Sequence, residues 1–270
     1  MVIPRFYVPQ PLAVGDCVTL PEAVANHAVR VLRLQPGDPL VLFNGEGGAY
    51  EGVLFPQEGT PSEPGRGKRD GKRDGKQSRA SKQHDVRVQL NAFQSEDRAS
   101  PVRIALWQGV SAAERMDYTW QKSVELGVYA CVPVETRRCV TRLDGARAEK
   151  RHAHWQGVIV AAAEQCGLNR LPVLMPVMQL TDALMTPAQG VRVMLDPDAT
   201  ESYPAWLERQ KGLSDLTILI GPEGGFAPEE IEAAKAAGFL CFRLGPRVFR
   251  TETAGPVALA VTQAMAGDLR

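Results

Sequence analysis

The sequence lacks an apolar run close to the roughly 20 residues that a membrane-spanning helix needs, and its first residues show no secretory apolar stretch. Its five cysteines form no C-x-x-C pair, and the four histidines show no metal-ligand spacing around them. An odd number of cysteines is typical of reduced thiols in the cytosol. These absences predict a cytoplasmic protein with no membrane partner and no metal.

Charge of one sign is not in excess either, because 31 basic residues balance 31 acidic ones. A nucleic-acid-binding protein of this balance must concentrate its positive charge locally. Residues 66–82 do so, with eight Lys and Arg against two Asp. The surrounding segment 57–84 cannot bury apolar surface, so we expect it to be disordered. Two interpretations of this insertion stay open: added phosphate contacts to a nucleic acid, or a surface insertion tolerated at little cost.

Residues 1–99 show the pattern of a small β domain. Short apolar runs predict strands, and in the last of them Val86, Val88 and Leu90 alternate with polar residues. The strands are expected at Cys17–Leu20, Pro39–Phe43, Tyr50–Phe55 and Val86–Phe93. The basic insertion is therefore a long hairpin loop, and we place the domain boundary near Ser100-Pro101.

Residues 100–270 alternate strands with helices, a pattern typical of an α/β domain with a mostly parallel sheet. Strands are expected at Val102–Leu106 and Val191–Leu195. Two helices each carry apolar residues on one face: Glu114–Leu126 through Met116, Trp120 and Val124, and Ala148–Cys166 through Trp155, Ile159 and Ala162. Gly127 is the expected cap of the first.

Two Gly-Pro loops follow two apolar strands that lie one helix apart in the sequence. The first loop, residues 221–225, follows the strand Thr217–Ile220, and the second, residues 245–254, follows Phe239–Leu244. Between them, Pro228 is suited to the first turn of a helix that Gly238 closes. Ligands of parallel sheets bind beyond the carboxyl ends of the strands, so both loops are expected to line one pocket.

The second loop is dense in functional groups. It carries two arginines, a carboxylate and two hydroxyls before an apolar helix expected at Val257–Ala266. A GPEGG sequence by itself is explained equally well by a turn and by a ligand site. The presence of both loops, each after a strand, favours a ligand site. Neither G-x-x-x-x-G-K-[ST] nor G-x-G-x-x-G is present, so the pocket is not a phosphate cradle.

Five blocks, in this order, resemble the ribosomal RNA small-subunit methyltransferase E family of knotted SPOUT methyltransferases. The blocks are Pro4-Arg5-Phe6-Tyr7, His27-Ala28-Val29-Arg30-Val31-Leu32-Arg33, Gln121-Lys122-Ser123-Val124-Glu125-Leu126-Gly127, Glu164-Gln165-Cys166-Gly167 with Asn169-Arg170, and the two loops. Two positions depart from the family pattern: Leu168, where arginine is common, and Phe249, where leucine is common. The family also lacks the basic insertion.

The resemblance implies a PUA-like RNA-binding β-barrel in residues 1–99. It further implies a SPOUT methyltransferase domain with a deep trefoil knot in residues 100–270, and a homodimer. The implied cofactor is S-adenosylmethionine, held by three loops at Leu195–Pro197, Ile220–Gly225 and Leu244–Ala254. The implied cofactor-binding residues are Leu195, Ile220, Gly221, Pro222, Glu223, Gly224, Gly225, Leu244, Gly245, Val248, Phe249, Arg250, Thr253 and Ala254.

The acceptor implied by the resemblance is ring nitrogen N3 of a uridine in 16S rRNA of the small ribosomal subunit. Neutral uracil holds a proton at N3, so the reaction needs a group that stabilises the developing anion or accepts the proton. Arg250 is the expected charge stabiliser, and Glu252 either orients Arg250 or accepts the proton. Glu223 is a second candidate acid, and for each carboxylate a helix cap or a structural ion pair remains an equal alternative.

Arginines in both domains are the candidates for RNA contacts, although a solvated face explains any single one of them. They are Arg5, Arg30 and Arg33 in the first domain, and Arg137, Arg138, Arg142 and Arg170 in the second. Two other functions stay open. One is methylation of another RNA, such as a ribose 2′-oxygen of transfer RNA, and the other is a non-catalytic RNA-binding factor in ribosome assembly.

Overall fold

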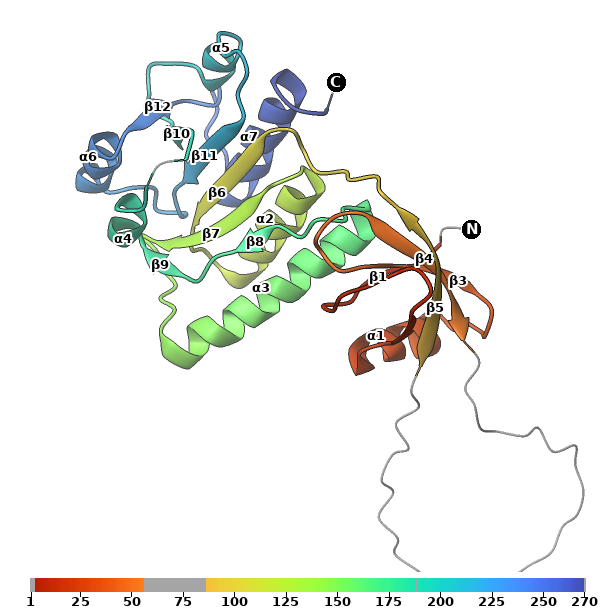
Figure 1. Cartoon of the computed structure of the whole chain (residues 1–270). Coiled ribbons are helices and arrows are strands. Elements are labelled where there is room, and N and C mark those ends of the chain that lie inside the picture. Colours follow the sequence, from red (N-terminus) through yellow and green to blue (C-terminus); the bar gives the residue numbers. More distant parts are fainter. Residues whose placement is uncertain (1–2, 56–85, 188, 270) are drawn as a thin grey trace, which may run out of the picture. The chain divides into compact units, whose positions relative to one another are not determined.

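The computed structural model describes residues 3–55, 86–187 and 189–269, so the disorder expected for the insertion 57–84 lies outside the described residues. The chain divides into two compact units, Met1–Glu96 and Asp97–Arg270 (Figure 1). The division falls a few residues before the boundary expected at Ser100-Pro101.

The N-terminal unit is built on a curled five-stranded sheet with the strand order β1-β3-β4-β5-β2 (Figure 1). Its strands are β1 (Arg5–Tyr7), β2 (Cys17–Thr19), β3 (Pro39–Phe43), β4 (Ala49–Phe55) and β5 (Arg87–Gln94). β1 runs parallel to β3, and the other pairs are antiparallel. The alternation expected in β5 is confirmed, because Val88 and Leu90 are buried in the core of this unit. β1 is three residues long and gave no recognisable pattern.

A short helical segment joins β2 to β3 and holds the HAVRVLR block. It consists of the helix α1 (Glu22–Asn26) and the π-helical turn η1 (His27–Val31). Arg33 follows with a φ of 58°, in the left-handed region that a side chain other than glycine seldom adopts. Arg30 and Arg33 are both exposed.

The C-terminal unit is an α/β domain whose seven-stranded sheet has the order β12-β10-β11-β6-β7-β8, with β9 paired to β7. All of its strand pairs are parallel. The strands are β6 (Arg103–Gly109), β7 (Ala130–Glu135), β8 (Val173–Leu174), β9 (Met178–Gln179), β10 (Val191–Leu195), β11 (Asp215–Ile220) and β12 (Phe239–Phe242). The mostly parallel sheet expected from the sequence is confirmed, and the carboxyl ends of β10, β11 and β12 meet at one edge.

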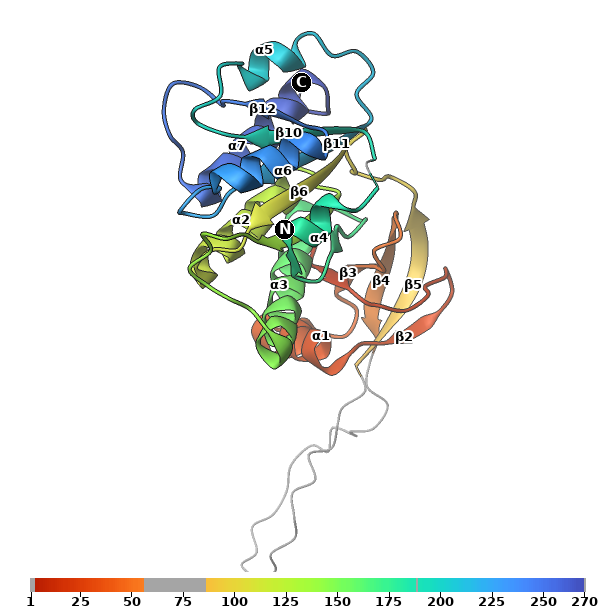
Figure 2. The same cartoon turned by 90° about the vertical axis from the view of Figure 1, so that its left-hand side faces the viewer.

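Helices cover both faces of this sheet. They are α2 (Ala113–Glu125), α3 (Gly145–Cys166), α4 (Leu180–Leu184), α5 (Tyr203–Leu207), α6 (Pro228–Ala236) and α7 (Thr251–Met265). The helices α2, α3 and α7 pack together on one face, and α4 and α6 lie on the other (Figures 1 and 2). Trp120 of α2 and Trp155 of α3 are fully buried and meet edge to face at 6.2 Å. The apolar faces expected for these two helices are therefore confirmed.

The start of α7 differs from the expected helix Val257–Ala266, which was wrong by six residues: the helix begins at Thr251. Proline donates no backbone hydrogen bond, so Gly255-Pro256 is an unfavourable sequence for a helix interior. In the structure Pro256 lies inside the helix and is buried. The first turn of α7 is consequently built from the polar residues of the second loop.

Candidate functional site

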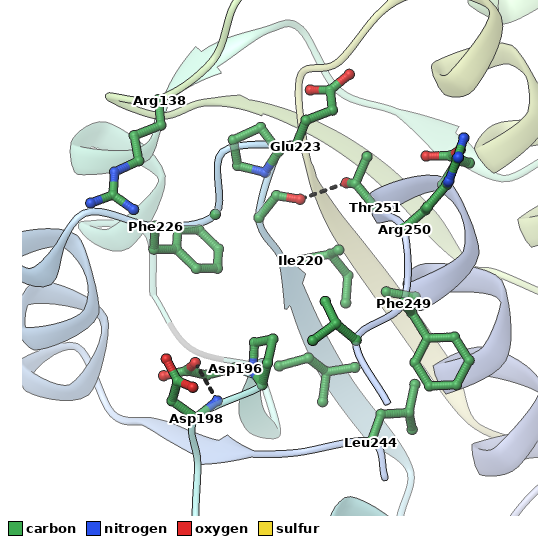
Figure 3. Close-up of a pocket in the computed structure, with 18 of the residues that line it drawn as sticks. Arg138, Asp196, Asp198, Ile220, Glu223, Phe226, Leu244, Phe249, Arg250 and Thr251 are labelled. Carbon is green, nitrogen blue, oxygen red and sulfur yellow. Dashed lines mark hydrogen bonds between the residues drawn. The ribbon is translucent and has the colours of Figure 1, made fainter. Parts of the chain in front are cut away.

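Three loops, each at the carboxyl end of a parallel strand, surround a cavity of about 540 Å³ (Figure 3). They follow β10, β11 and β12, the three neighbouring strands at one end of the sheet. Twelve of the residues expected to hold a cofactor line this cavity: Leu195, Ile220, Gly221, Pro222, Glu223, Gly225, Leu244, Gly245, Val248, Phe249, Arg250 and Ala254. Gly224 and Thr253 are not among the lining residues.

The first loop fits closely against the end of β6. A Cβ atom on Gly109 would lie 2.4 Å from the backbone nitrogen of Pro222, so only glycine allows this approach. A Cβ atom on Gly221 would lie 3.2 Å from the ring of Phe226. The backbone of the first loop is thus fixed from two sides.

A hydrogen-bond relay fixes the first loop to the start of α7. Thr251 donates from Oγ1 to the carbonyl oxygen of Gly221 at 2.5 Å (Figure 3). Gln108, fully buried at the end of β6, donates from Nε2 to the same Thr251 oxygen at 2.8 Å. Because these atoms are buried or half-buried, the relay holds the first and second loops in one arrangement.

Arg138 reaches the cavity from the loop that follows β7, on the side opposite Arg250 in Figure 3. It donates from a guanidinium nitrogen to the carbonyl oxygen of Gly224 at 3.2 Å. A Cβ atom on Gly224 would lie 3.0 Å from the Arg138 Cβ atom. Gly224 therefore packs against Arg138 and does not face the cavity. An arginine expected to contact RNA is therefore also part of the cavity wall.

Four arginines line the cavity, and they differ in their partners. Arg115 forms an ion pair with Glu223, and Arg138 binds the Gly224 carbonyl. Within the described part of the chain, the Arg247 and Arg250 side chains have no hydrogen-bond or ion-pair partner, and both residues are exposed. Arg250 directly precedes the first residue of α7. Its guanidinium therefore lies at the cavity rim with its hydrogen-bond donors free.

Glu223 and Glu252 lie on either side of Arg115, a residue that the sequence analysis missed. Arg115 stands in the first turn of α2, and its only signal in the sequence was its place shortly after a strand. Its Nη1 atom lies 2.7 Å from Glu223 Oε1, and its Nε atom lies 3.9 Å from Glu252 Oε1. The two candidate acids thus share one cation.

The remaining candidate RNA contacts fall in both units. Arg5 stacks over the ring of Phe43 at 5.2 Å, and Arg170 forms an ion pair with Asp97 at 2.7 Å. Arg137 pairs with Glu229, and Arg142 lies 3.6 Å from the buried Glu135. Leu168, which stands where the family commonly has arginine, is buried and belongs to the core.

The thiols near the site are not set up as nucleophiles. All five cysteines are free, and burial raises the pKa of Cys139 and of Cys241, which keeps both protonated at neutral pH. No three His, Cys, Asp or Glu side chains in residues 3–55, 86–187 and 189–269 are placed to hold a metal ion. No helix within those ranges has the length and apolar character to cross a bilayer.

Two family models match the chain. The model of an RNA methyltransferase domain matches residues 98–263, and the model of an RNA methyltransferase PUA domain matches residues 20–55. The first covers most of the C-terminal unit and the second lies within the N-terminal unit. The two units therefore correspond to two known kinds of domain.

Several relatives match the chain over nearly its full length. The chain is 32% identical to the ribosomal RNA small subunit methyltransferase E of Mycobacterium bovis, over 96% of this chain and 90% of that protein. It is 34% identical to the enzyme of the same name from Neisseria gonorrhoeae, solved bound to S-adenosylmethionine, with a TM-score of 0.84 and full coverage of both chains. A Legionella pneumophila structure holding the same cofactor has 32% identity and a TM-score of 0.84, and the match covers 99% of this chain and 100% of that one.

Proposed function

The chain belongs to the ribosomal RNA small subunit methyltransferase E family, and from this premise we propose that it transfers a methyl group from S-adenosylmethionine to N3 of a uridine in 16S rRNA. The observation that carries the proposal is the cavity itself. Three strand-end loops enclose it in a chain that matches a cofactor-bound relative over its full length. The uridine and the N3 position are inferred from the family.

The cavity suits S-adenosylmethionine in size and chemistry. A volume of about 540 Å³ is within the range of small-molecule sites. Leu195, Ile220, Leu244 and Val248 give it apolar walls, and a Cβ atom on Gly245 would meet nothing within 4 Å. The bound cofactor supplies a methyl group already activated by its sulfonium. The protein therefore needs mainly to align donor and acceptor.

Arg250 and Glu252 are the proposed catalytic residues. A neutral uracil must lose its N3 proton as the new bond forms, so negative charge grows on the ring. The Arg250 guanidinium, with free donors at the cavity rim, stabilises that charge. Glu252, the second residue of α7, accepts the proton.

Other parts of the proposal depend on family membership. We propose that residues 1–99 bind RNA through Arg5, Arg30 and Arg33, and that residues 100–270 form a knotted catalytic domain with further contacts from Arg138 and Arg170. A homodimer, the small-subunit context and a cytoplasmic location belong to the same proposal. The role of the basic insertion keeps the two interpretations given above.

The product of the reaction tests the function directly. Incubation of the protein with labelled cofactor and small ribosomal subunits that lack native methylation should give 3-methyluridine as the labelled nucleoside. Label in 5-methyluridine or on ribose would refute the N3 assignment. Absence of both cofactor binding and label transfer would favour a non-catalytic assembly factor, and label only in transfer RNA would favour the other RNA substrate.

Thr251→Val tests whether the relay shapes the cofactor site. The substitution keeps the volume but leaves the Gly221 carbonyl without the Thr251 donor, and the Gln108 amide keeps only its longer hydrogen bond to the Gly109 carbonyl, at 3.3 Å. We expect the affinity for S-adenosylmethionine to fall about tenfold, because an unpaired buried polar group costs about 1–3 kcal/mol. Titration calorimetry measures this, with Thr217→Val, on β11 and outside the cavity lining, as the comparison that should change affinity less than about twofold. Equal losses in both variants would show that the relay does not matter.

A further inference from the structure

Arg115 lines the cavity but has no role in the reaction proposed above. It comes from α2, outside the three loops, and lines the cavity between Glu223 and Glu252. We infer that Arg115 is a positioning residue, which holds Glu252 so that one of its oxygens is kept for the N3 proton of the acceptor base. The inference depends on the proposed function and adds a division of labour between the two acids.

Glu223 is the acid that anchors Arg115. Its Oε1 atom accepts hydrogen bonds from Arg115 Nη1 at 2.7 Å and from the backbone nitrogen of Ala112 at 3.1 Å. Ala112 is the residue that precedes α2, so Glu223 fixes both the start of this helix and the arginine that the helix carries. Both donors meet the same Oε1 atom, so the structural role of Glu223 is to hold the helix start and Arg115 in place.

Glu252 is held differently. Its Oε1 atom faces Arg115 Nε at 3.9 Å, which is an ion pair without a direct hydrogen bond. Its Oε2 atom is buried and accepts no hydrogen bond from the described residues. A buried carboxylate oxygen without a donor is costly, so the arrangement suits a site where a ligand supplies the donor. The N3–H group of uracil is a donor of that kind.

The charges around Glu252 come from several elements. Arg115 on α2, Glu223 on the first loop and Arg250 before α7 are its neighbours, and Arg138, Arg247, Asp196 and Asp198 stand elsewhere on the cavity wall. Arg115 is the one of these cations that forms an ion pair with Glu252 in the described part of the chain. The ion pair orients the carboxylate, with Oε1 toward the guanidinium and Oε2 left for a ligand.

In the proposed step, N3 of the base loses its proton to Glu252 as it takes the methyl group. The N3–H bond breaks, its proton passes to Glu252 Oε2, and its electron pair forms the bond to the methyl carbon. The carbon–sulfur pair returns to sulfur, which leaves as the neutral thioether of S-adenosylhomocysteine. Glu252 then returns the proton to water, so Arg115 touches no reacting atom and acts only through the carboxylate.

A double-mutant cycle tests this division of labour. In single turnovers with labelled cofactor and unmethylated small subunits, Glu252→Gln should lower the methyl-transfer rate about 100-fold and Glu223→Gln less than about fivefold. Arg115→Met should lower it about 30-fold alone but less than about threefold in the Glu252→Gln background, because both changes remove one interaction. Arg115→Lys keeps the charge and should stay within about fivefold of the wild type.

Two controls separate positioning from damage to the fold. Arg103→Met breaks the ion pair of Arg103 with Asp215, at the start of β6 and away from the cavity, and should leave the rate unchanged. The dissociation constant of S-adenosylmethionine and the thermal midpoint of Arg115→Met should remain close to those of the wild type. Rate losses that multiply in the double variant would overturn the inference, as would a loss of cofactor affinity equal to the loss in rate. These results leave the proposed function intact if the product is still 3-methyluridine, whereas a different product refutes that function separately.

Discussion

Arg250→Ala is expected to slow methyl transfer about 100- to 1000-fold while changing the dissociation constant of S-adenosylmethionine less than about threefold. The physical reason is the place of Arg250, exposed at the cavity rim and without a partner in the described residues. A guanidinium that is free in the ground state can stabilise charge that appears only as the reaction proceeds. Single-turnover rates and calorimetry on the same preparations measure the two quantities.

Two further variants show whether the effect of Arg250→Ala comes from its charge and its place. Arg250→Lys keeps the positive charge but loses the planar fork, so it should recover part of the rate and fall between alanine and the wild type. Arg209→Ala removes an exposed arginine that pairs with Glu201 away from the cavity, and should have no effect. An equal fall in rate and cofactor affinity for Arg250→Ala would show that Arg250 binds the cofactor and takes no part in the chemistry.

The elements that the sequence predicted well are those with a complete local signal. The strands Pro39–Phe43 and Val191–Leu195 agree residue for residue with the structure, because each is an apolar run bounded by residues that break it. The helix expected at Glu114–Leu126 was placed within one residue, since Gly127 ends it with a φ of 72°. Such signals reside in neighbouring residues and need no tertiary information.

The start of α7 shows where local signals mislead. Gly255-Pro256 has the composition of a break, yet the helix passes through it because Gly255 packs against Leu106 and Gln108 of β6, where a Cβ atom would lie 3.1 Å from Leu106. Tertiary packing therefore overrides a weak local preference. The consequence for function is that Thr251 and Glu252 belong to a helix whose start is fixed against the sheet.

The candidate site was predictable only where it consists of strand ends. The two Gly-Pro loops were predicted from their position directly after apolar strands, and residues of both loops line the cavity. Gln108 lies on β6, Arg115 on the helix that follows it, and Arg138 in the loop that follows β7. They reach the cavity because of the order in which the strands pair. Since β11 lies beside β6 although more than a hundred residues separate them, no local pattern could have shown these contacts.

Replacing Gly221 and Gly245 together by valine is expected to lower the affinity for S-adenosylmethionine at least about 1000-fold. The γ carbons of valine would enter space around the first loop, where even a Cβ atom on Gly221 lies 3.2 Å from Phe226. Gly245 has a φ of 137°, in a region that a branched side chain rarely adopts. Steric overlap and backbone strain each cost about 1–3 kcal/mol, so together they cost about 4 kcal/mol. That free energy corresponds to a dissociation constant about 1000-fold higher.

The matched control is Gly212→Val, outside the cavity lining. Gly212 has a φ of 67° and open space around it, so valine there brings the backbone strain without obstructing the cavity. Calorimetry should show wild-type affinity for this control, and circular dichroism should show that both variants are folded. Unchanged affinity in a folded Gly221→Val/Gly245→Val variant would place the cofactor elsewhere on the molecule. Loss of affinity in Gly212→Val as well would mean that strain alone loosens the domain, and the cavity would lose its strongest support as the binding site.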